Sequence, residues 1–161
     1  MKGNNVILKD VNGVDFNFLE FIKTNDCVVF LYPKMGQSGK FLDDDLKNKE
    51  GMTGCTLQTK SYENLKDEFL KNNFNIVAIG SHSFEKQKAF KQEVEASFIF
   101  LNDEKFILEK ELGLKTFNTN DGNKFYFRQT LVFKNSKLIY KHDVKDAQSD
   151  ASQTLKFIES L

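Results

Sequence analysis

The sequence has no tryptophan, and among its 161 residues it has one proline, one arginine and two cysteines. Two cysteines without the spacing of metal ligands exclude a disulfide framework or a zinc site, and we expect both to be thiols in a reducing compartment. No apolar run reaches the roughly 18 residues of a transmembrane helix, and none of signal-peptide length follows Met1. We therefore expect a cytoplasmic protein with no membrane partner.

The sequence also has no excess of charge of either sign. Its 23 basic and 23 acidic residues give a formal net charge of zero at pH 7, and the two kinds alternate along the chain. Nucleic-acid binding usually depends on a broad positive field, which such a distribution does not provide. The composition therefore argues against a nucleic-acid partner.

Two rare residues stand out. Twenty-two of the 23 basic residues are lysine and the single arginine is Arg128, while the single proline is Pro33. A lone arginine suggests a place where a planar fork of donors is required and a lysine ammonium would not serve. Chance is the alternative that composition alone leaves open.

Chain length and a hydrophobic content of 40% predict a single domain over residues 1–161. Apolar runs predict strands at residues 6–9, 27–32, 74–79, 98–101, 125–133 and 138–140. Helical periodicity and capping residues predict helices at residues 56–72, 83–94, 103–112 and 151–158, with Ser83 and Asp103 as N-caps and Gly113 as a stop.

The order of these elements predicts an α/β fold. After an N-terminal hairpin around Gly13, strands and helices alternate, and residues 134–137 form a final hairpin turn. We expect a mixed sheet with helices on both faces, parallel where helices intervene and antiparallel at the last hairpin, which is a thioredoxin-like arrangement. Residues 34–50 are polar and lack an apolar period, so we expect an exposed loop there. Its acidic run at residues 43–45 lacks the spacing of a calcium loop, and no metal or cofactor is predicted.

Cys55 has the sequence context of a reactive thiol. It follows the first long strand and its loop, in the first turn of a helix expected to begin at residues 53–56. Such helix N-termini gather at the crevice beyond the carboxyl ends of the strands. There the helix dipole and unpaired amides favour a thiolate. Gly54 would leave space for a small substrate, and Thr53 and Thr56 offer hydroxyl groups.

Each candidate also has an inert interpretation. Cysteine is among the most often buried residue types, so Cys55 could be a core or capping thiol. Arg128 could be a surface strand residue paired with an acid such as Asp103 or Glu104. Tyr32 could border the crevice or pack beneath it.

Five short segments carry a family resemblance. They are Leu31-Tyr32-Pro33-Lys34, Gly54-Cys55-Thr56, Ile79-Gly80-Ser81, Phe100-Leu101-Asn102-Asp103 and Arg128-Gln129-Thr130-Leu131-Val132. In order and spacing they resemble the peroxiredoxins of the bacterioferritin-comigratory, or Q-type, branch, over nearly the whole chain. The resemblance implies a thiol peroxidase acting on hydrogen peroxide and small organic hydroperoxides.

The resemblance also implies the roles of individual residues. Cys55 matches the peroxidatic cysteine, whose thiolate attacks the peroxide and becomes a sulfenic acid. Arg128 matches the arginine that holds the thiolate charged and donates hydrogen bonds as charge moves to the leaving oxygen. Pro33 matches the proline that shields the sulfur, and Tyr32 and Gly54 are expected beside it in the substrate pocket.

The chain departs from the family pattern in several places. The loop before the cysteine is much longer, and Met52 stands where the family has a threonine. A thioether cannot donate a hydrogen bond to peroxide, so either Thr53 takes over this role or efficiency is reduced. Gln58 stands where many members have an acidic residue, and Lys60 stands where many have a second cysteine.

Without that second cysteine, we expect an external thiol to reduce the sulfenic acid in a one-cysteine cycle. Thioredoxin, glutaredoxin or a small thiol would be the partner of a monomer or weak homodimer. Cys27 begins its strand, at the end of the sheet opposite to the crevice and roughly 17–20 Å away, and is expected to be a buried structural thiol.

Two rival functions stay open. A redox sensor or interaction module on the same scaffold is favoured by Met52 and Lys60, and stoichiometric oxidation of Cys55 without recycling would identify it. A thiol-disulfide oxidoreductase is the weaker rival, because the sequence has no Cys-x-x-Cys pair.

Overall fold

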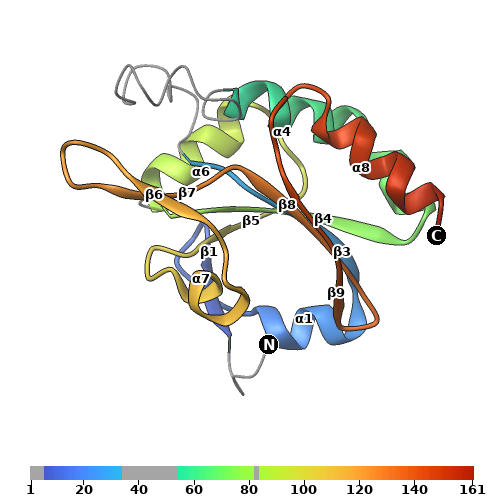
Figure 1. Ribbon diagram of the computed structural model, residues 1–161, viewed down its shortest axis with the longest axis horizontal. Coiled ribbons are helices and arrows are strands. Elements are labelled where there is room, and N and C mark those ends of the chain that lie inside the picture. The colour runs from blue at the N-terminus through green and yellow to red at the C-terminus, as the bar shows by residue number, and fades with distance from the viewer. Residues whose placement is uncertain (1–5, 34–53, 82–83) are drawn as a thin grey trace.

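The computed structural model describes residues 6–33, 54–81 and 84–161. Figure 1 shows a central sheet with helices on both of its faces. The predicted loop at residues 34–50, the acidic run within it and the predicted N-cap Ser83 lie outside the described residues.

The main sheet has seven strands in the order β2-β1-β5-β4-β3-β8-β9. The strands are β1 (Ile7–Asp10), β2 (Asp15–Asn17), β3 (Asp26–Leu31), β4 (Phe74–Gly80), β5 (Ile99–Asn102), β8 (Gln129–Lys134) and β9 (Lys137–Asp143). β3 pairs with β4 and β4 with β5 in parallel, whereas β1 with β2, β1 with β5, β3 with β8 and β8 with β9 are antiparallel. The predicted mixed sheet with its N-terminal hairpin is confirmed.

The centre of the sheet is buried on both faces. Side chains of β3 alternate between two apolar clusters, with Val28 and Phe30 in one and Cys27, Val29 and Leu31 in the other. This burial explains why the sequence shows a continuous apolar run there rather than an alternating one. The run therefore marks the strand on which both halves of the core are built.

Helices of unequal number cover the two faces (Figure 1). One face carries α4 (Cys55–Asn64), α5 (Lys66–Lys71), α6 (Phe84–Glu93) and α8 (Asp150–Glu159); the other carries α1 (Phe18–Thr24) and α7 (Ile107–Leu112). On the first face the ring of Tyr62 from α4 stacks on Phe30 of β3, with ring centroids 4.4 Å apart and planes at 4°. This stack joins α4 to the central strand.

The single helix predicted over residues 56–72 is wrong, because α4 and α5 are separate helices that meet at Leu65. Leu65 has φ −100° and ψ 6°, outside the helical values. The apolar period did not reveal the break, because Tyr62, Leu65 and Phe69 keep helical spacing across it. Rings of Tyr62 and Phe69 consequently still meet, 5.6 Å apart.

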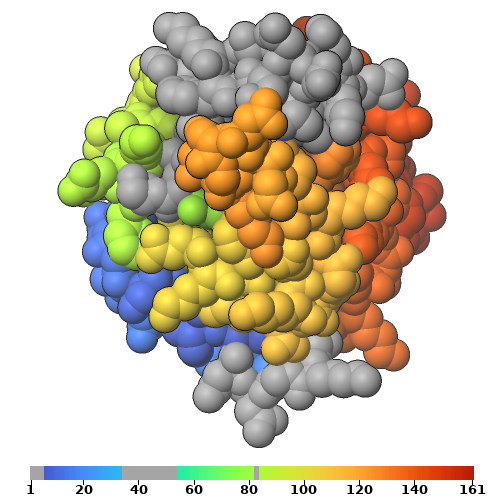
Figure 2. All heavy atoms as spheres, turned by 60° about the vertical axis from the view of Figure 1, so that its left-hand side comes forward, coloured from blue at the N-terminus to red at the C-terminus, as the bar shows by residue number. Residues whose placement is uncertain are grey.

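The single strand predicted over residues 125–133 is also two strands. β7 (Lys124–Tyr126) pairs with β6 (Thr116–Asn118) in a separate two-stranded sheet, and β8 then enters the main sheet. We expected strands to pair in parallel wherever a helix intervenes. The β6–β7 hairpin reverses the chain once more after α7, and β8 therefore runs antiparallel to β3. Figure 2 shows α7 and the hairpin as one continuous yellow and orange part of the surface.

Turn residues were predicted more accurately than strand lengths. The last hairpin turns at Asn135 and Ser136, whose φ values of 53° and 69° lie in the left-handed region that tight hairpins require. Gly113, with φ 65°, ends α7 as predicted. The sequence did not predict α1, a seven-residue helix whose N-cap Asn17 accepts a hydrogen bond from the Glu20 amide at 3.0 Å.

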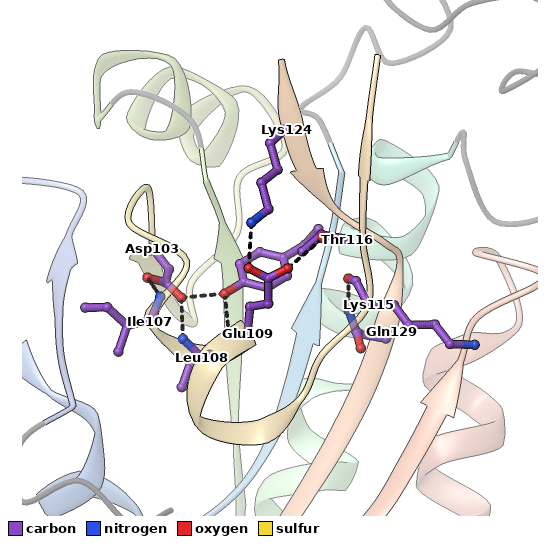
Figure 3. Close-up of polar contacts among 9 residues, drawn as sticks. Asp103, Ile107, Leu108, Glu109, Lys115, Thr116, Lys124 and Gln129 are labelled. Atoms are coloured by element: carbon purple, nitrogen blue, oxygen red, sulfur yellow. Dashed lines mark hydrogen bonds and ion pairs between the residues drawn. The ribbon is translucent and has the colours of Figure 1, made fainter. Parts of the chain in front are cut away.

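Asp103 caps α7 from a distance (Figure 3). The helix begins at Ile107 rather than at residue 103, and the amides of Ile107 and Leu108 donate to the two oxygens of Asp103 at 2.8 and 3.0 Å. The hydroxyl of Tyr126 also donates to Asp103, at 2.7 Å, and accepts from the Glu109 amide at 3.0 Å. The carboxylate therefore fastens α7 to β7.

Two further findings concern residues 6–33, 54–81 and 84–161. None of their helices combines the length and the apolar character needed to cross a membrane. The same residues contain no group of three histidine, cysteine, aspartate or glutamate side chains that could share a metal ion.

The buried tyrosines give a first prediction. Burial raises the pKa of Tyr32, Tyr62 and Tyr126, and nearby carboxylates raise the last two further. A tyrosine in an unfolded chain ionises near pH 10, so above about pH 10 the unfolded state loses protons that the folded state keeps. Below that pH these groups leave stability unchanged, and above it each lowers the free energy of unfolding by up to about 1.4 kcal/mol per pH unit.

Tyrosinate absorbance measures this directly, because the chain has no tryptophan. In denaturant all four tyrosines should ionise together near pH 10. In the folded protein the three buried ones should stay protonated until the alkaline unfolding transition. Ionisation of all four near pH 10 without loss of the folded circular-dichroism signal would contradict this prediction.

Candidate active site

Cys55 is the first residue of α4, and its position depends on the glycine before it. Gly54 has φ 100° and is the N-cap of the helix. A Cβ atom at Gly54 would lie 3.0 Å from the Cβ of Ala147, so both the left-handed backbone and the close approach favour glycine. This is a backbone reason for Gly54 that the sequence did not suggest, and its place in the substrate pocket stays a prediction.

The sulfur lies where a helix offers unpaired donors. The first amides of an α-helix have no partner within the helix and form the positive end of its dipole. Cys55 is only 2% exposed and belongs to the apolar cluster beneath α4. The predicted position at the helix start is confirmed, in surroundings where charge interactions are only weakly screened.

Arg128 is fully buried and points its guanidinium at Cys55. Nη2 donates to the Cys55 Sγ at 3.1 Å, and Nη1 donates to the Gln58 Oε1 at 2.7 Å. The two nitrogens of one planar group thus serve two acceptors, which a single ammonium would not do in this geometry. The alternative of a surface arginine paired with Asp103 is wrong, because Arg128 is buried and Asp103 caps α7.

The backbone around Arg128 is held on both sides. It lies between β7 and β8, where the Lys115 carbonyl accepts from the Phe127 amide at 3.0 Å and from the Gln129 side chain at 2.9 Å; Figure 3 shows the second contact. The Arg128 carbonyl itself accepts from the Val144 amide at 3.0 Å. These hydrogen bonds therefore fix the backbone of Arg128 at the break between the two strands.

Gln58 connects Arg128 to a carboxylate that the sequence analysis missed. One helical turn after Cys55, Gln58 is fully buried, and its Nε2 donates to the Asp150 Oδ2 at 3.0 Å. Asp150 begins α8 and is 1% exposed. The spacing of Cys55 and Gln58 could have placed them on one helix face, but no local signal joins residue 58 to residue 150.

Tyr32 is fully buried beneath this region. Its hydroxyl accepts from the Gln87 Nε2 at 2.9 Å, and its ring packs near Phe90 and Phe100. Burial raises the pKa of Tyr32 and the nearby Cys55 charge raises it further, although the Gln87 hydrogen bond opposes both. Tyr32 is therefore a neutral side chain in the core, and its contact with a substrate stays a prediction.

The glycine at the end of β4 is explained by Tyr32. A Cβ at Gly80 would lie 2.8 Å from atoms of the tyrosine ring, closer than side chains approach one another. Pro33 follows Tyr32 and is also buried. Thr53, the other predicted catalytic residue, lies outside the described residues, as does Met52.

The two cysteines lie on different faces of the sheet. Cys27 belongs to the cluster that also contains Val29 and Leu31, whereas Cys55 belongs to the opposite cluster. No disulfide joins these two residues. Burial raises the pKa of Cys27 and the neighbouring Asp26 charge raises it further, so Cys27 is a neutral, buried thiol. An internal disulfide would require the sheet to open.

Comparison with known proteins gives the family. A model of the family described as Redoxin matches residues 1–156. Among curated proteins, chloroplastic peroxiredoxin Q of Sedum lineare is 27% identical over 158 residues, covering 96% of this chain and 74% of that protein. Chloroplastic peroxiredoxin Q of Suaeda salsa is 26% identical over 159 residues, covering 96% of this chain and 64% of that protein.

Solved structures agree on the fold. Peroxidoxin BcpB from Mycobacterium tuberculosis has a TM-score of 0.77 at 17% identity, with 98% of this chain and 93% of that chain covered. Peroxiredoxin Q from Xanthomonas campestris has a TM-score of 0.77 at 16% identity, covering 96% and 90%. The curated proteins that it resembles are peroxiredoxins of the Q type, and the chain belongs to the redoxin family.

Proposed function

We propose that the protein is a one-cysteine thiol peroxidase that reduces hydrogen peroxide and small organic hydroperoxides at Cys55. The observation that carries the proposal is the 3.1 Å contact between the Arg128 Nη2 and the Cys55 Sγ at the start of α4. Family membership supplies the reaction class, and the contact supports Cys55 as the sulfur on which the reaction would occur.

The charge on the sulfur is the first requirement of this chemistry, since the thiolate and not the thiol is the nucleophile. A buried guanidinium at hydrogen-bond distance and the amides of a helix start both favour the anion. In an interior of low dielectric these interactions are stronger than at the surface. The arrangement is built before substrate arrives, so little reorganisation is needed when the reaction begins.

The oxidative half-reaction then follows from the geometry. The Cys55 thiolate attacks the terminal oxygen of the peroxide, the S–O bond forms as the O–O bond breaks, and Cys55 becomes a sulfenic acid. The leaving oxygen carries away the negative charge and takes up a proton to depart as water or an alcohol. Arg128 can donate from Nη2 to the leaving oxygen as the negative charge moves there from the sulfur. Its Nη1 stays bonded to Gln58 and holds the guanidinium in place.

The reductive half-reaction requires a thiol from outside the chain. Lys60 occupies the position five residues after Cys55, and Cys27 is buried on the other face of the sheet. An external thiolate would attack the sulfenic sulfur and expel hydroxide, which takes up a proton and departs as water, leaving a mixed disulfide. A second thiol would then restore the Cys55 thiol and carry away the new disulfide. Thioredoxin, glutaredoxin or a small thiol fits this requirement.

We further propose that Pro33, Tyr32 and Gly54 line the substrate pocket beside the sulfur. Thr53 would donate the hydrogen bond to peroxide that the family's threonine, replaced here by Met52, would otherwise donate. Two cysteines with no disulfide between them suit a reducing compartment such as the cytoplasm. A monomer or weak homodimer completes the proposal.

Replacement of the two cysteines tests the assignment of the nucleophile. Cys55→Ser should abolish peroxide reduction, because a hydroxyl is not ionised and cannot replace the thiolate. Cys27→Ala should keep turnover close to that of the unchanged protein. The measurement is peroxide consumption in the presence of dithiothreitol after removal of contaminating catalase. Residual turnover in Cys55→Ser, or loss of turnover in folded Cys27→Ala, would refute the assignment.

Arg128→Lys tests the requirement for a planar fork. A lysine keeps the charge but has one nitrogen for the two acceptors, Cys55 and Gln58, so we expect Cys55 oxidation to slow about 100-fold or more. Rapid-quench mass spectrometry of the Cys55 peptide gives the rate. Chemical denaturation reports separately on folding. A rate within a factor of about two of the unchanged protein, less than 0.5 kcal/mol by the usual conversion, would show that charge alone suffices.

The products of stoichiometric oxidation test the one-cysteine cycle. Peroxide should add oxygen to Cys55, and subsequent addition of glutathione should yield a mixed disulfide at the same residue. Intact-mass spectrometry with peptide mapping distinguishes these products. A mass loss of two hydrogens within one chain would instead reveal a bond between Cys27 and Cys55, and the same loss per pair of chains a crosslinked dimer.

A further inference from the structure

The Gln58 amide has only one orientation that suits both of its neighbours. Its Oε1 accepts from Arg128 at 2.7 Å, and its Nε2 donates to Asp150 at 3.0 Å. A guanidinium has donors and no acceptor, whereas a carboxylate has acceptors and no donor. If the amide turned by half a rotation, donors would face donors at Arg128 and acceptors would face acceptors at Asp150. The carboxylate therefore determines which end of Gln58 meets the arginine.

Asp150 is itself fixed by other polar groups. Its Oδ2 also accepts from the hydroxyls of Tyr62 at 2.6 Å and Thr130 at 2.7 Å. Its Oδ1 accepts from Thr154 at 3.3 Å. The donors come from α4, β8 and α8, so one carboxylate is held where these three elements meet. Such a group does not turn or withdraw without disturbing all of them.

We infer that Asp150 is a positioning residue for the reaction, which sets the direction of Arg128 toward Cys55 through Gln58. The inference rests on the proposed function, because it assigns a step in preparing that same sulfur. Asp150 acts on the thiol indirectly, through the Gln58 amide and then the Arg128 guanidinium. A hydrogen bond to a carboxylate polarises the amide and makes its oxygen a stronger acceptor for the arginine.

The negative charge has a second effect on this chain of contacts. Arg128 is a fully buried cation, and a buried charge is tolerated when opposite charge and hydrogen bonds compensate for lost water. Asp150 supplies this opposite charge, with the side-chain amide of Gln58 between its carboxylate and the guanidinium. It therefore stabilises the buried guanidinium without contacting it directly.

A second buried aspartate provides a matched control. Asp103 is 2% exposed and accepts from the Tyr126 hydroxyl at 2.7 Å and from two α7 amides. It resembles Asp150 in burial and in the number of strong donors, but its contacts lead to α7 rather than to Arg128. Asp103→Asn should therefore destabilise the fold while leaving the chemistry of Cys55 unchanged.

The test compares Asp150→Asn, Asp103→Asn, Gln58→Glu and the double variant Gln58→Glu with Asp150→Asn. The rate of Cys55 oxidation by hydrogen peroxide is measured in the folded proteins by rapid quenching and mass spectrometry. The rate of Cys55 alkylation by iodoacetamide at fixed pH is measured in parallel. Denaturant unfolding gives the stability of each variant independently of both rates.

We expect Asp150→Asn to slow both reactions about tenfold, since one charge-assisted hydrogen bond is lost, and Asp103→Asn to slow neither by more than about twofold. Gln58→Glu alone places two buried carboxylates side by side and should be slow and unstable. Adding Asp150→Asn moves the single carboxylate beside Arg128 and should recover much of the rate of both reactions. Both reactions should also be faster in the double variant than in Asp150→Asn alone, which a merely structural Asp150 would not give.

Several results would overturn the inference. They are rates of Asp150→Asn within about twofold of the unchanged protein, an equal slowing in Asp103→Asn, or a double variant no faster than Gln58→Glu. If Asp150→Asn does not fold, Gln58→Met removes the connection and leaves the carboxylate in place; it should be as slow, and an unchanged rate would again reject the inference. If the unchanged protein is alkylated but not oxidised, the proposed function fails, and the alkylation rates still decide the role of Asp150.

Discussion

The contact between a buried guanidinium and a sulfur at the start of a helix is the constraint around which this protein is organised. Arg128 has no exposure to solvent, so its donors must find acceptors within the protein. Its Nη1 and Nη2 find them in Gln58 and Cys55 on successive turns of α4. The break between β7 and β8, the left-handed Gly54 and the position of α4 together bring these groups into contact.

The sheet separates this site from a second buried carboxylate. On one face, Asp150 gathers donors from α4, β8 and α8; near the other, Asp103 fastens α7 to β7. In each network a buried aspartate accepts several hydrogen bonds, but the two aspartates connect different elements. One contacts Arg128 through Gln58, whereas the other joins α7 to Tyr126 of β7.

Local patterns predicted the parts of this structure that local forces determine. The continuous apolar run of β3, the turn at Asn135 and the cysteine at a helix start could all be predicted because each depends on neighbours in sequence. The α4–α5 break was missed because Tyr62, Leu65 and Phe69 keep their period across it, and the β6–β7 hairpin was missed because its strands are only three residues long.

The site was predicted in part, for the same reason. Cys55 and Arg128 could be paired because rarity and a family resemblance singled them out. Gln58 was noticed only as a departure, and Asp150 not at all, because the contact between them joins residues 92 positions apart. No period or spacing records such a contact. A buried polar network becomes visible only when the elements that contribute to it are placed in space.

The approach of Gly54 to Ala147 has a consequence for how this protein can diverge. Gly54 caps the helix that begins at Cys55, whereas Ala147 lies in the segment that leads into α8. A side chain at position 54 would need the space that the Ala147 Cβ occupies. During evolution, position 54 should therefore stay glycine for as long as position 147 carries a side chain.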